Sequence, residues 1–518
     1  MSPVQKIAPT QSAAAVVAAV KAADGAAIPV LDGDEWDQSP YLPALSIVEA
    51  ATAVFAGHQV RELAHSAADD LAATTSEIVR VACLARLERK RLLCVVTGIP
   101  GAGKTLAGLT AVHHPELRRP DGSAAAVFLS GNGPLVRVVR TALARDVARL
   151  HGRRKEAARQ VSTFVQNVHQ FLGEYGVKHP DRAPPEHVVV FDEAQRAWSA
   201  QQMDRKKGVA TSEPAMMLNV MERCPGWSVV VAVVGGGQEI HTGEGGLSEW
   251  GKAIAERSAQ WEVVASPEAM SGGPSLAGQR LFEAAIGPAI QVTTSKHLHL
   301  RTNVRSFRAQ VVGQWVNSVL EGDSARARSL LSYMAEFPIA MTRHLSSARS
   351  WLSAHGGSET CAGAMGLVAS SGALRHRAHG LELSSGFRRG YPFEEWFLAS
   401  NRDIRASSRL EVAATEFECQ GLELDWIGVC WGDDLVPDQG GGGWQTRRLV
   451  GNRWTVVGDP SARQLLLNKY RVLLTRARRG MIVWVPKGDP SDPTRDPDRL
   501  DRTAEFLKSC GIPEVVDG

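Results

Sequence analysis

Short apolar runs alternate with longer amphipathic stretches along most of this 518-residue chain. Strands buried in parallel sheets have such near-continuous apolar sequences, and a helix is expected at each crossover between them. Two series of runs are present, so the pattern predicts an α/β fold with two layers of similar size. The first series is LLCVVTG, AAVFLSG, HVVVFDE and WSVVVAVVGGG, and the second is IQVTT, MGLVASS, LEVAAT, WIGVCWG and GMIVWVP.

The sequence before the first apolar run has a different, Ala-rich pattern. We predict a mainly helical N-terminal region over residues 1–88, one α/β domain over residues 89–290 and a second over residues 291–518. A chain of this length agrees with that division, because 518 residues exceed what one hydrophobic core usually organises.

Two stretches of the N-terminal region need an interpretation. Ser12–Val20 is small and apolar, but alanine is weakly hydrophobic and Lys6 gives only a thin charged start. We interpret it as a helix or a loose arm, not an export signal, and expect a cytoplasmic protein. The acids Asp32, Asp34 and Glu35 are interpreted as a solvated turn, because no second cluster with a lysine stands near them.

Composition and charge change this picture little. The chain is 44% hydrophobic and 22% charged, and its net charge of +3 neither requires nor excludes nucleic acid. Seven scattered cysteines contain no CxxC pair, which argues against a disulfide framework or a zinc site. No apolar run approaches the roughly 20 residues of a membrane helix.

The first apolar run leads into CVVTGIPGAGKTLAGL, a complete G-x-x-x-x-G-K-T motif between an expected strand and an expected helix. Its glycines let backbone N–H groups close around phosphate oxygens, Lys104 reaches the β- and γ-phosphates, and Thr105 holds Mg²⁺. A chance glycine turn is the alternative, which the strand–loop–helix context disfavours. The residues of this expected site are Gly98, Gly101, Gly103, Lys104 and Thr105.

Acidic residues follow the third run, HVVVFDE, at the strand end where open α/β sheets bind ligands. We predict that Asp192 coordinates Mg²⁺ and that Glu193 polarises the attacking water. A solvated strand end is the usual reading of such a pair alone, but its position downstream of a phosphate loop favours catalysis. Gln238, at the end of the fourth run, is either a γ-phosphate sensor or part of a tight turn.

The order of these motifs resembles that of superfamily 1 helicases of the UvrD/Rep type. GIPGAGKT, VVFDEAQ and VGGGQ look like motifs I, II and III, and VFLSGNGPLV stands where motif Ia would be. LRTNVRSFRA is similar to motif IV, ATEFECQGLELDWIGV to motif V, and NKYRVLLTRARRGMIVWVP to motif VI. The resemblance covers about residues 90–490 and is strongest to the Schlafen-like DNA/RNA helicase domain family, which GLVASSGALRHRAHGL also resembles.

This resemblance implies two RecA-like P-loop NTPase domains that use ATP and Mg²⁺. It implies that Arg305 contacts the γ-phosphate, that Arg476 is an arginine finger, and that Gln420, Gly421 and Glu423 touch nucleic acid and nucleotide. Arginines in such positions contribute about 10³–10⁵ in rate, whereas a surface salt bridge is the ordinary role of a single arginine. Motif IV has NVRS where the family has NYRS, so an aromatic residue that stacks on the base is absent.

A nucleic-acid track needs cations and stacking surfaces. Candidate residues are Asn132 and, in TFVQNVHQFL, His169 and Phe171, although helical core packing explains Phe171 equally well. The basic stretch RLHGRRKEAARQ is either a solvated helix face or a phosphate contact.

The sequence therefore predicts an ATP-dependent DNA/RNA helicase or single-strand translocase, with single-stranded DNA or RNA as partner and no membrane. One alternative is a regulatory ATPase switch that binds a protein partner of unknown identity, for which single strands would not stimulate hydrolysis. Another is the ATPase component of a nuclease-linked phage-defence system, although the sequence has no convincing nuclease cluster.

Overall fold

A computed structural model describes most of the chain from residue 46 onward. The predictions for Ser12–Val20, for the acids at 32–35, and for Gln238 and Arg305 fall outside the described residues. The described residues are 46–55, 68–99, 101–119, 125–152, 154–235, 245–257, 260–276, 278–283, 287–302, 307–334, 337–356, 365–438, 440 and 443–515.

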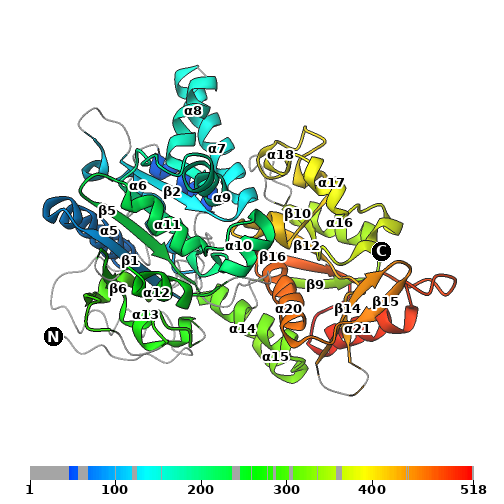
Figure 1. Ribbon diagram of the computed structural model, residues 1–518. Helices are drawn as coiled ribbons and strands as arrows, with labels where there is room; N and C mark the ends of the chain where they lie inside the picture. Colours follow the sequence, from blue (N-terminus) through cyan, green and yellow to red (C-terminus); the bar gives the residue numbers. More distant parts are fainter. Residues whose placement is uncertain are drawn as a thin grey trace, which may run out of the picture. The chain divides into compact units, whose positions relative to one another are not determined.

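Within the described residues the first sheet has eight strands, and their pairs are parallel. Its order is β3-β2-β4-β5-β1-β6-β7, with β8 beside the end of β1, so β1 lies between β5 and β6 (Figure 1). The strands are β1 (Arg91–Gly98), β2 (Ala126–Ser130), β3 (Val165–Asn167), β4 (Val188–Asp192), β5 (Ser228–Val233), β6 (Glu262–Ala265), β7 (Val292–Thr294) and β8 (His299–Leu300).

Alternate residues of this sheet pack into two separate apolar cores, as expected for strands covered on both faces. Leu92 and Cys94 belong to the core that includes α3 (Ile47–Phe55), α5 (Ala68–Glu88), α6 (Lys104–His113), α7 (Gly133–His151) and α8 (Arg154–Phe164). Leu93 and Val95 belong to the core that includes α9 (Val168–Leu172), α10 (Ala200–Lys207), α11 (Glu213–Glu222), α12 (Ser248–Ala255) and α13 (Pro267–Ser271).

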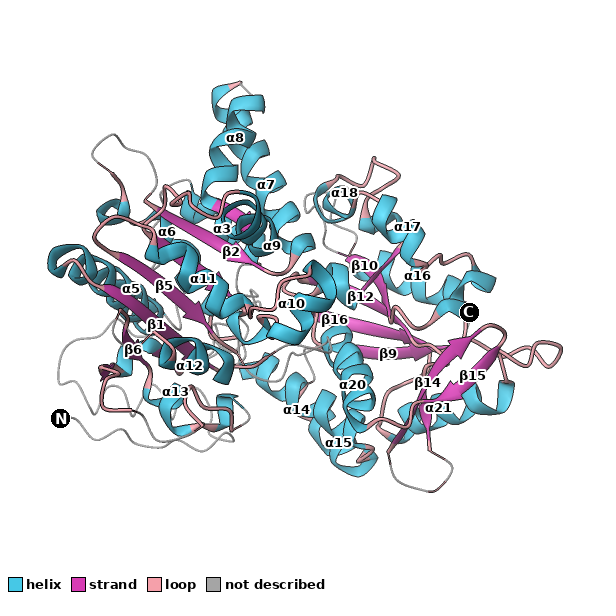
Figure 2. Cartoon of the chain, in the orientation of Figure 1, coloured by secondary structure: helices cyan, strands magenta, loops and turns pink. Residues whose placement is uncertain are grey.

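The second sheet, as far as the structure describes the chain, has five parallel strands in the order β11-β10-β12-β16-β9. These strands are β9 (Ile339–Thr342), β10 (Met365–Ala369), β11 (Ala413–Thr415), β12 (Leu424–Cys430) and β16 (Ala477–Trp484). Figure 2 shows them in magenta among the helices of this part of the chain. These helices are α14 (Phe307–Glu321), α15 (Ser324–Leu331), α16 (Leu345–His355), α17 (Ser385–Gly390), α18 (Phe393–Leu398), α19 (Glu416–Cys419), α20 (Pro460–Leu474) and α21 (Pro497–Ser509).

A third, antiparallel sheet is inserted between β12 and α20. Its order is β13-β14-β15, and the strands are β13 (Leu435–Pro437), β14 (Trp444–Val450) and β15 (Arg453–Val456). None of the apolar runs named in the sequence analysis covers these three strands.

Several helices begin with a capping side chain followed by proline. The cap accepts a hydrogen bond from a first-turn N–H, and proline tolerates the first turn because it has no N–H to satisfy. The caps and prolines thus mark the starts of helices, most of which connect successive strands. The caps are Asn132 for α7, Ser212 for α11, Ser266 for α13, Asp459 for α20 and Asp496 for α21.

The expected α/β class with parallel sheets, preceded by helical residues, is confirmed. One strand assignment was wrong: IQVTT was expected in the second layer, but β7 pairs with β6 in the first sheet. An apolar run specifies a strand without specifying its neighbour, because pairing is decided by tertiary contacts. The division at residues 88 and 290 stays a prediction. None of the helices in the described ranges has the length and apolarity needed to cross a bilayer.

Candidate functional site

The loop between β1 and α6 has the backbone geometry of an anion cradle. Gly101 and Gly103 adopt left-handed conformations, with φ of 79° and 81°, which residues with a side chain rarely tolerate. Gly103 is the N-cap of α6 and supplies no side-chain cap. The first-turn N–H groups of α6 therefore suit an anionic ligand such as a phosphate.

Lys104 lies back across this loop. Its ammonium group donates hydrogen bonds to the carbonyls of Gly98 and Ile99, at 2.8 and 3.0 Å. A Cβ added at Gly235, just after β5, would lie 3.0 Å from the Lys104 Cε, so glycine leaves room for the lysine. Gly98 also needs to be glycine, because an added Cβ would lie 2.7 Å from the Cβ of Leu300 in β8.

Asp192, at the end of β4, lies against the first turn of α6. The Thr105 hydroxyl is 3.2 Å from both carboxylate oxygens of Asp192, whose side chain is buried. Burial, and then the neighbouring Glu193 charge, raise the pKa of Asp192 to about 8, while Thr105 and Lys104 oppose the rise. A cation beside this carboxylate would favour its ionised form.

The chemistry of these donors fits Mg²⁺ held by few protein ligands. A hydroxyl and a carboxylate stand together, and Mg²⁺ commonly keeps waters and phosphate oxygens in its remaining positions. Among the described residues, no group of three or more His, Cys, Asp or Glu side chains forms a metal cluster. The predicted pair, Thr105 and Asp192, is therefore suited to a metal that arrives with nucleotide.

Gln195 is a functional candidate whose role the sequence analysis missed. Its amide donates to the Glu193 carboxylate at 2.5 Å, and its carbonyl oxygen accepts from the Gly235 N–H at 3.1 Å. Gln195 thus joins the predicted water-polarising acid to the end of β5. Glu193 itself has a left-handed backbone, with φ of 54°. The signal in the sequence was the position of Gln195 inside DEAQ.

Arg196 and Gln420 connect the loop after β4 to the segment after α19. The Arg196 guanidinium donates to the Gln420 side-chain oxygen at 2.6 Å, and the Asn132 amide donates to the Gln420 backbone carbonyl at 2.6 Å. Gln420 is buried, and Gly421 has a φ of 76° that favours glycine. Segments expected to be motifs Ia, II and V are therefore in direct contact.

Arg476 and Glu423 directly precede the neighbouring strands β16 and β12 of the second sheet. Arg476 is buried, and its guanidinium donates to the Val472 carbonyl at 3.0 Å and to the Thr475 hydroxyl at 3.1 Å. Its own carbonyl accepts from the Leu424 N–H, next to the half-buried Glu423. The expected roles of Arg476 and Glu423 at the nucleotide stay predictions.

The candidate track residues have different surroundings. Phe171 is buried in the core, which confirms the packing explanation. His169 pairs with the buried Glu213 at 2.7 Å and packs on Trp198, with ring centroids 4.3 Å apart. Asn132 caps α7 through its oxygen and contacts Gln420 through its nitrogen.

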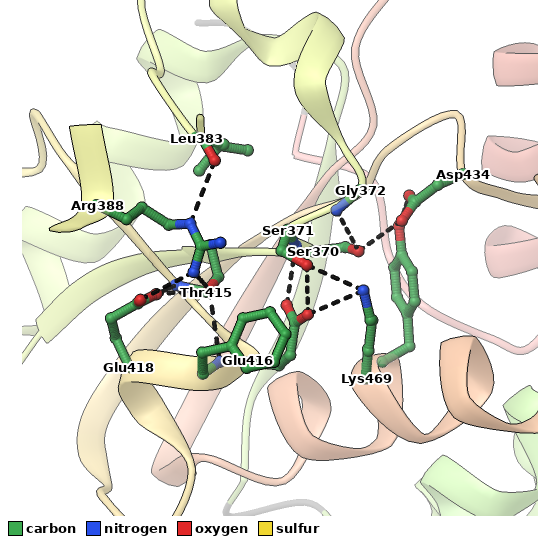
Figure 3. A network of polar contacts seen from close by, with 12 residues as sticks. Ser370, Ser371, Gly372, Leu383, Arg388, Thr415, Glu416, Glu418, Asp434 and Lys469 are labelled. Atoms are coloured by element: carbon green, nitrogen blue, oxygen red, sulfur yellow. Dashed lines mark hydrogen bonds and ion pairs between the residues drawn. The ribbon is translucent and has the colours of Figure 1, made fainter. Parts of the chain in front are cut away.

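A polar network occupies the carboxyl ends of β10 and β11 (Figure 3). Glu416 is fully buried and accepts hydrogen bonds from the backbone N–H and the hydroxyl of Ser371, at 2.8 and 2.5 Å. Lys469 of α20 forms an ion pair with Glu416 at 3.1 Å and donates to Ser371 at 2.9 Å. Beside it, Arg388 donates to Thr415 and Glu418. These interactions hold the expected motif V against the end of β10 and against α20.

Two consecutive carboxylates after β12 differ in how they are satisfied. Asp434 accepts hydrogen bonds from the Ser370 and Tyr470 hydroxyls, at 2.5 and 2.6 Å. Asp433 is buried, and within the described part of the chain one of its carboxylate oxygens has no hydrogen-bond partner. Burial raises the pKa of Asp433 to about 7; the Arg447 charge opposes this rise and Asp434 adds to it.

Asp433→Asn is expected to stabilise the protein relative to the unaltered chain, and to do so more at pH 8 than at pH 5. The folded pKa is raised above 3.8, so the contribution of this group to stability is present below about pH 4 and is lost as pH rises through 7. Asparagine does not titrate and avoids that loss, which is on the order of a few kcal/mol. The measurement is the thermal midpoint of both proteins at the two pH values, with Asp438→Asn on the exposed surface as control. Equal midpoint differences at both pH values would contradict the raised pKa.

Comparison with known families assigns the chain. The family model described as Schlafen group 3, DNA/RNA helicase domain, matches residues 91–487. The chain belongs to this family. The matched range includes the phosphate loop, the Asp192–Glu193 pair and the Gln420 segment. The Schlafen-like resemblance is thus confirmed, whereas the superfamily 1 subtype stays a prediction.

Solved helicase structures show only a distant likeness. The structure titled DUF1998 helicase MrfA bound to DNA has 11% identity and a TM-score of 0.30, covering 84% of this chain and 51% of that one. This chain thus spans about half of the length of MrfA. The Hef helicase domain of Pyrococcus furiosus has 11% identity and a TM-score of 0.26, covering 82% of this chain and 95% of that one. No curated protein matches the sequence.

Proposed function

We propose that this protein is an ATP-dependent translocase on single-stranded DNA or RNA, with ATP hydrolysis at the carboxyl edge of the first sheet. The observation that carries the proposal is the cluster of Lys104, Thr105, Asp192 and Glu193 beside a glycine loop with left-handed backbone. Membership of a helicase-domain family supports the same activity.

Each residue has a distinct task in this proposal. Bound Mg²⁺·ATP would supply the phosphoryl group and the charge that neutralises its oxygens. Lys104 exchanges the carbonyls of its own loop for phosphate oxygens, and Thr105 and Asp192 hold the cation. Glu193, kept in place by Gln195, accepts a hydrogen bond from the attacking water and orients it.

The contact through Gln420 supports coupling of hydrolysis to a strand. Arg196 follows Glu193 by three residues. It donates to Gln420, which lies in a segment that the family resemblance assigns to nucleic-acid contact. A strand that moves Gln420 would also move Arg196 and the loop bearing Glu193. Arg305 and Arg476 are the proposed cations for the transition state, acting when the nucleotide is bound.

The test is the steady-state rate of ATP hydrolysis with and without single-stranded DNA or RNA. We expect one polymer to stimulate hydrolysis in a Mg²⁺-dependent manner, because a translocase hydrolyses ATP as it moves along its nucleic acid. Removal of Mg²⁺ with a chelator should abolish the stimulated rate. Hydrolysis that neither polymer changes would overturn the translocase and favour a switch that responds to a protein partner.

The Gln420→Ala variant tests the proposed path of coupling. It removes the acceptor of Arg196, and typical coupling free energies predict a 5- to 150-fold loss of stimulation. Gln464→Ala is a matched control, since Gln464 is exposed and donates to Asn468 of its own helix. Full stimulation in Gln420→Ala would exclude this contact from the coupling path.

A further inference from the structure

The hairpin of β14 and β15 has one packed face and one exposed face. Arg448 is paired across the strands with Thr455, and Val450 with Arg453, and all four residues are exposed. The opposite face carries Trp454, whose indole N–H donates to the Thr494 carbonyl at 2.8 Å. The hairpin therefore contacts the loop of residues 489–496 through one face, while its other face is exposed to solvent.

The two arginines of the open face have no acidic partner among the described residues. Neither Arg448 nor Arg453 has a side-chain hydrogen bond or ion pair with any residue of the described chain. By contrast, Arg388, Arg405 and Arg478 each form ion pairs with carboxylates. In an antiparallel pair, Arg448 and Arg453 occupy diagonal positions roughly 7–8 Å apart.

The hairpin itself contains no acidic residue, and the loop that it contacts on its packed face contains the acids Asp489, Asp492 and Asp496. No Asp or Glu lies between Asp438 and Asp459. At the end of the hairpin, the exposed Arg463 donates to the Val457 carbonyl and has no ion pair with a described carboxylate. Two exposed arginines thus lie on the hairpin and a third, Arg463, lies in the first turn of α20. Their positive charge is complementary to phosphate groups.

We propose that the β14–β15 hairpin is a second nucleic-acid contact that binds the phosphate backbone of a duplex. The inference rests on the proposed function and adds a substrate class to it. Single-strand sites combine cations with aromatic side chains on which bases stack. The exposed face has arginine, valine and threonine but no aromatic residue, so it can hold phosphates and has no surface for stacked bases. Duplex DNA presents phosphates with its bases already stacked.

The place of the hairpin in the chain gives this contact a use. It is inserted between β12 and α20, and Asp459, which caps α20, follows β15 by three residues. Lys469 of α20 is bonded to Glu416 and Ser371 at the sheet edge. A duplex held by the hairpin is thereby connected, through α20, to the segment expected to contact the single strand.

The experiment compares the full chain with the variant Arg448→Glu/Arg453→Glu in binding to a blunt duplex and to a single strand of equal length, without nucleotide. We expect duplex affinity to fall roughly tenfold or more at about 0.1 M salt, and the slope of log K against log salt to decrease by about two. Affinity for the single strand and its stimulation of hydrolysis should remain as in the unaltered protein.

A matched control makes the same change of charge elsewhere. The variant Arg326→Glu/Arg402→Glu alters two exposed arginines outside the hairpin, and it should retain duplex affinity. Equal losses in both variants would reduce the effect to net charge and overturn the proposal. Absence of duplex binding by the unaltered protein, or unchanged duplex affinity in the hairpin variant, would also overturn it and leave an acidic protein as the partner to test. Because the duplex-binding measurements need no hydrolysis, their failure is distinguishable from a failure of the proposed translocase.

Discussion

Lys104→Ala is expected to lower the rate of ATP hydrolysis by about 10²–10³ or more without unfolding the protein. Its ammonium group already lies over the loop, 2.8 Å from the Gly98 carbonyl, in the space that Gly235 leaves open. It is thus placed to meet charge that develops on the transferring phosphoryl group. Removing one such pre-organised donor typically costs this much in rate.

The measurement is the hydrolysis rate at saturating ATP, together with nucleotide affinity and the thermal midpoint. Lys252→Ala is the control, because Lys252 is exposed and forms its ion pair with Glu249 on the same helix. A normal rate in Lys104→Ala would remove the phosphate loop from catalysis. A lost fold would leave the rate uninterpretable, in which case Lys104→Arg, which keeps the charge but not the geometry, decides the same point.

The phosphate site was predictable because its requirements are local. Gly101 and Gly103 must have positive φ, and the lysine and threonine follow them directly in the chain. The acids of β4 were predictable because an apolar run ending in Asp192 fixes them at the carboxyl edge of a parallel sheet.

Contacts between distant segments were less accessible from sequence. The Gln195 link to Gly235 depends on β4 and β5 being neighbours, and the Arg196 contact with Gln420 spans 224 positions. β9 was not predicted, and β7 was assigned to the wrong sheet, because short apolar runs do not encode their partners. The hairpin was missed because its strands, WQTRRLV and RWTV, contain no continuous apolar run.

Glu193→Gln is expected to retain ATP binding and to lose hydrolysis by about 10²–10⁴. Glutamine has nearly the same shape, and its carbonyl oxygen can still accept from the Gln195 amide, so the loop after β4 should keep its conformation. The variant lacks the negative charge that orients and polarises water. Single-turnover hydrolysis and the affinity for a fluorescent ATP analogue separate the two effects. Glu249→Gln, which alters the half-buried partner of the exposed Lys252 on α12, is the control.

Asp192→Asn distinguishes the two acids. If Asp192 holds the cation, this variant should lose the dependence of nucleotide binding on Mg²⁺, whereas Glu193→Gln should keep it. A Glu193→Gln protein that hydrolyses ATP normally would require another base. Gln195 cannot serve, because an amide does not accept a proton at neutral pH. Asp192, the other carboxylate at this strand end, would then have to bind the metal and also act on the water. In that case the double variant Asp192→Asn/Glu193→Gln would lose no more of the hydrolysis rate than Asp192→Asn alone.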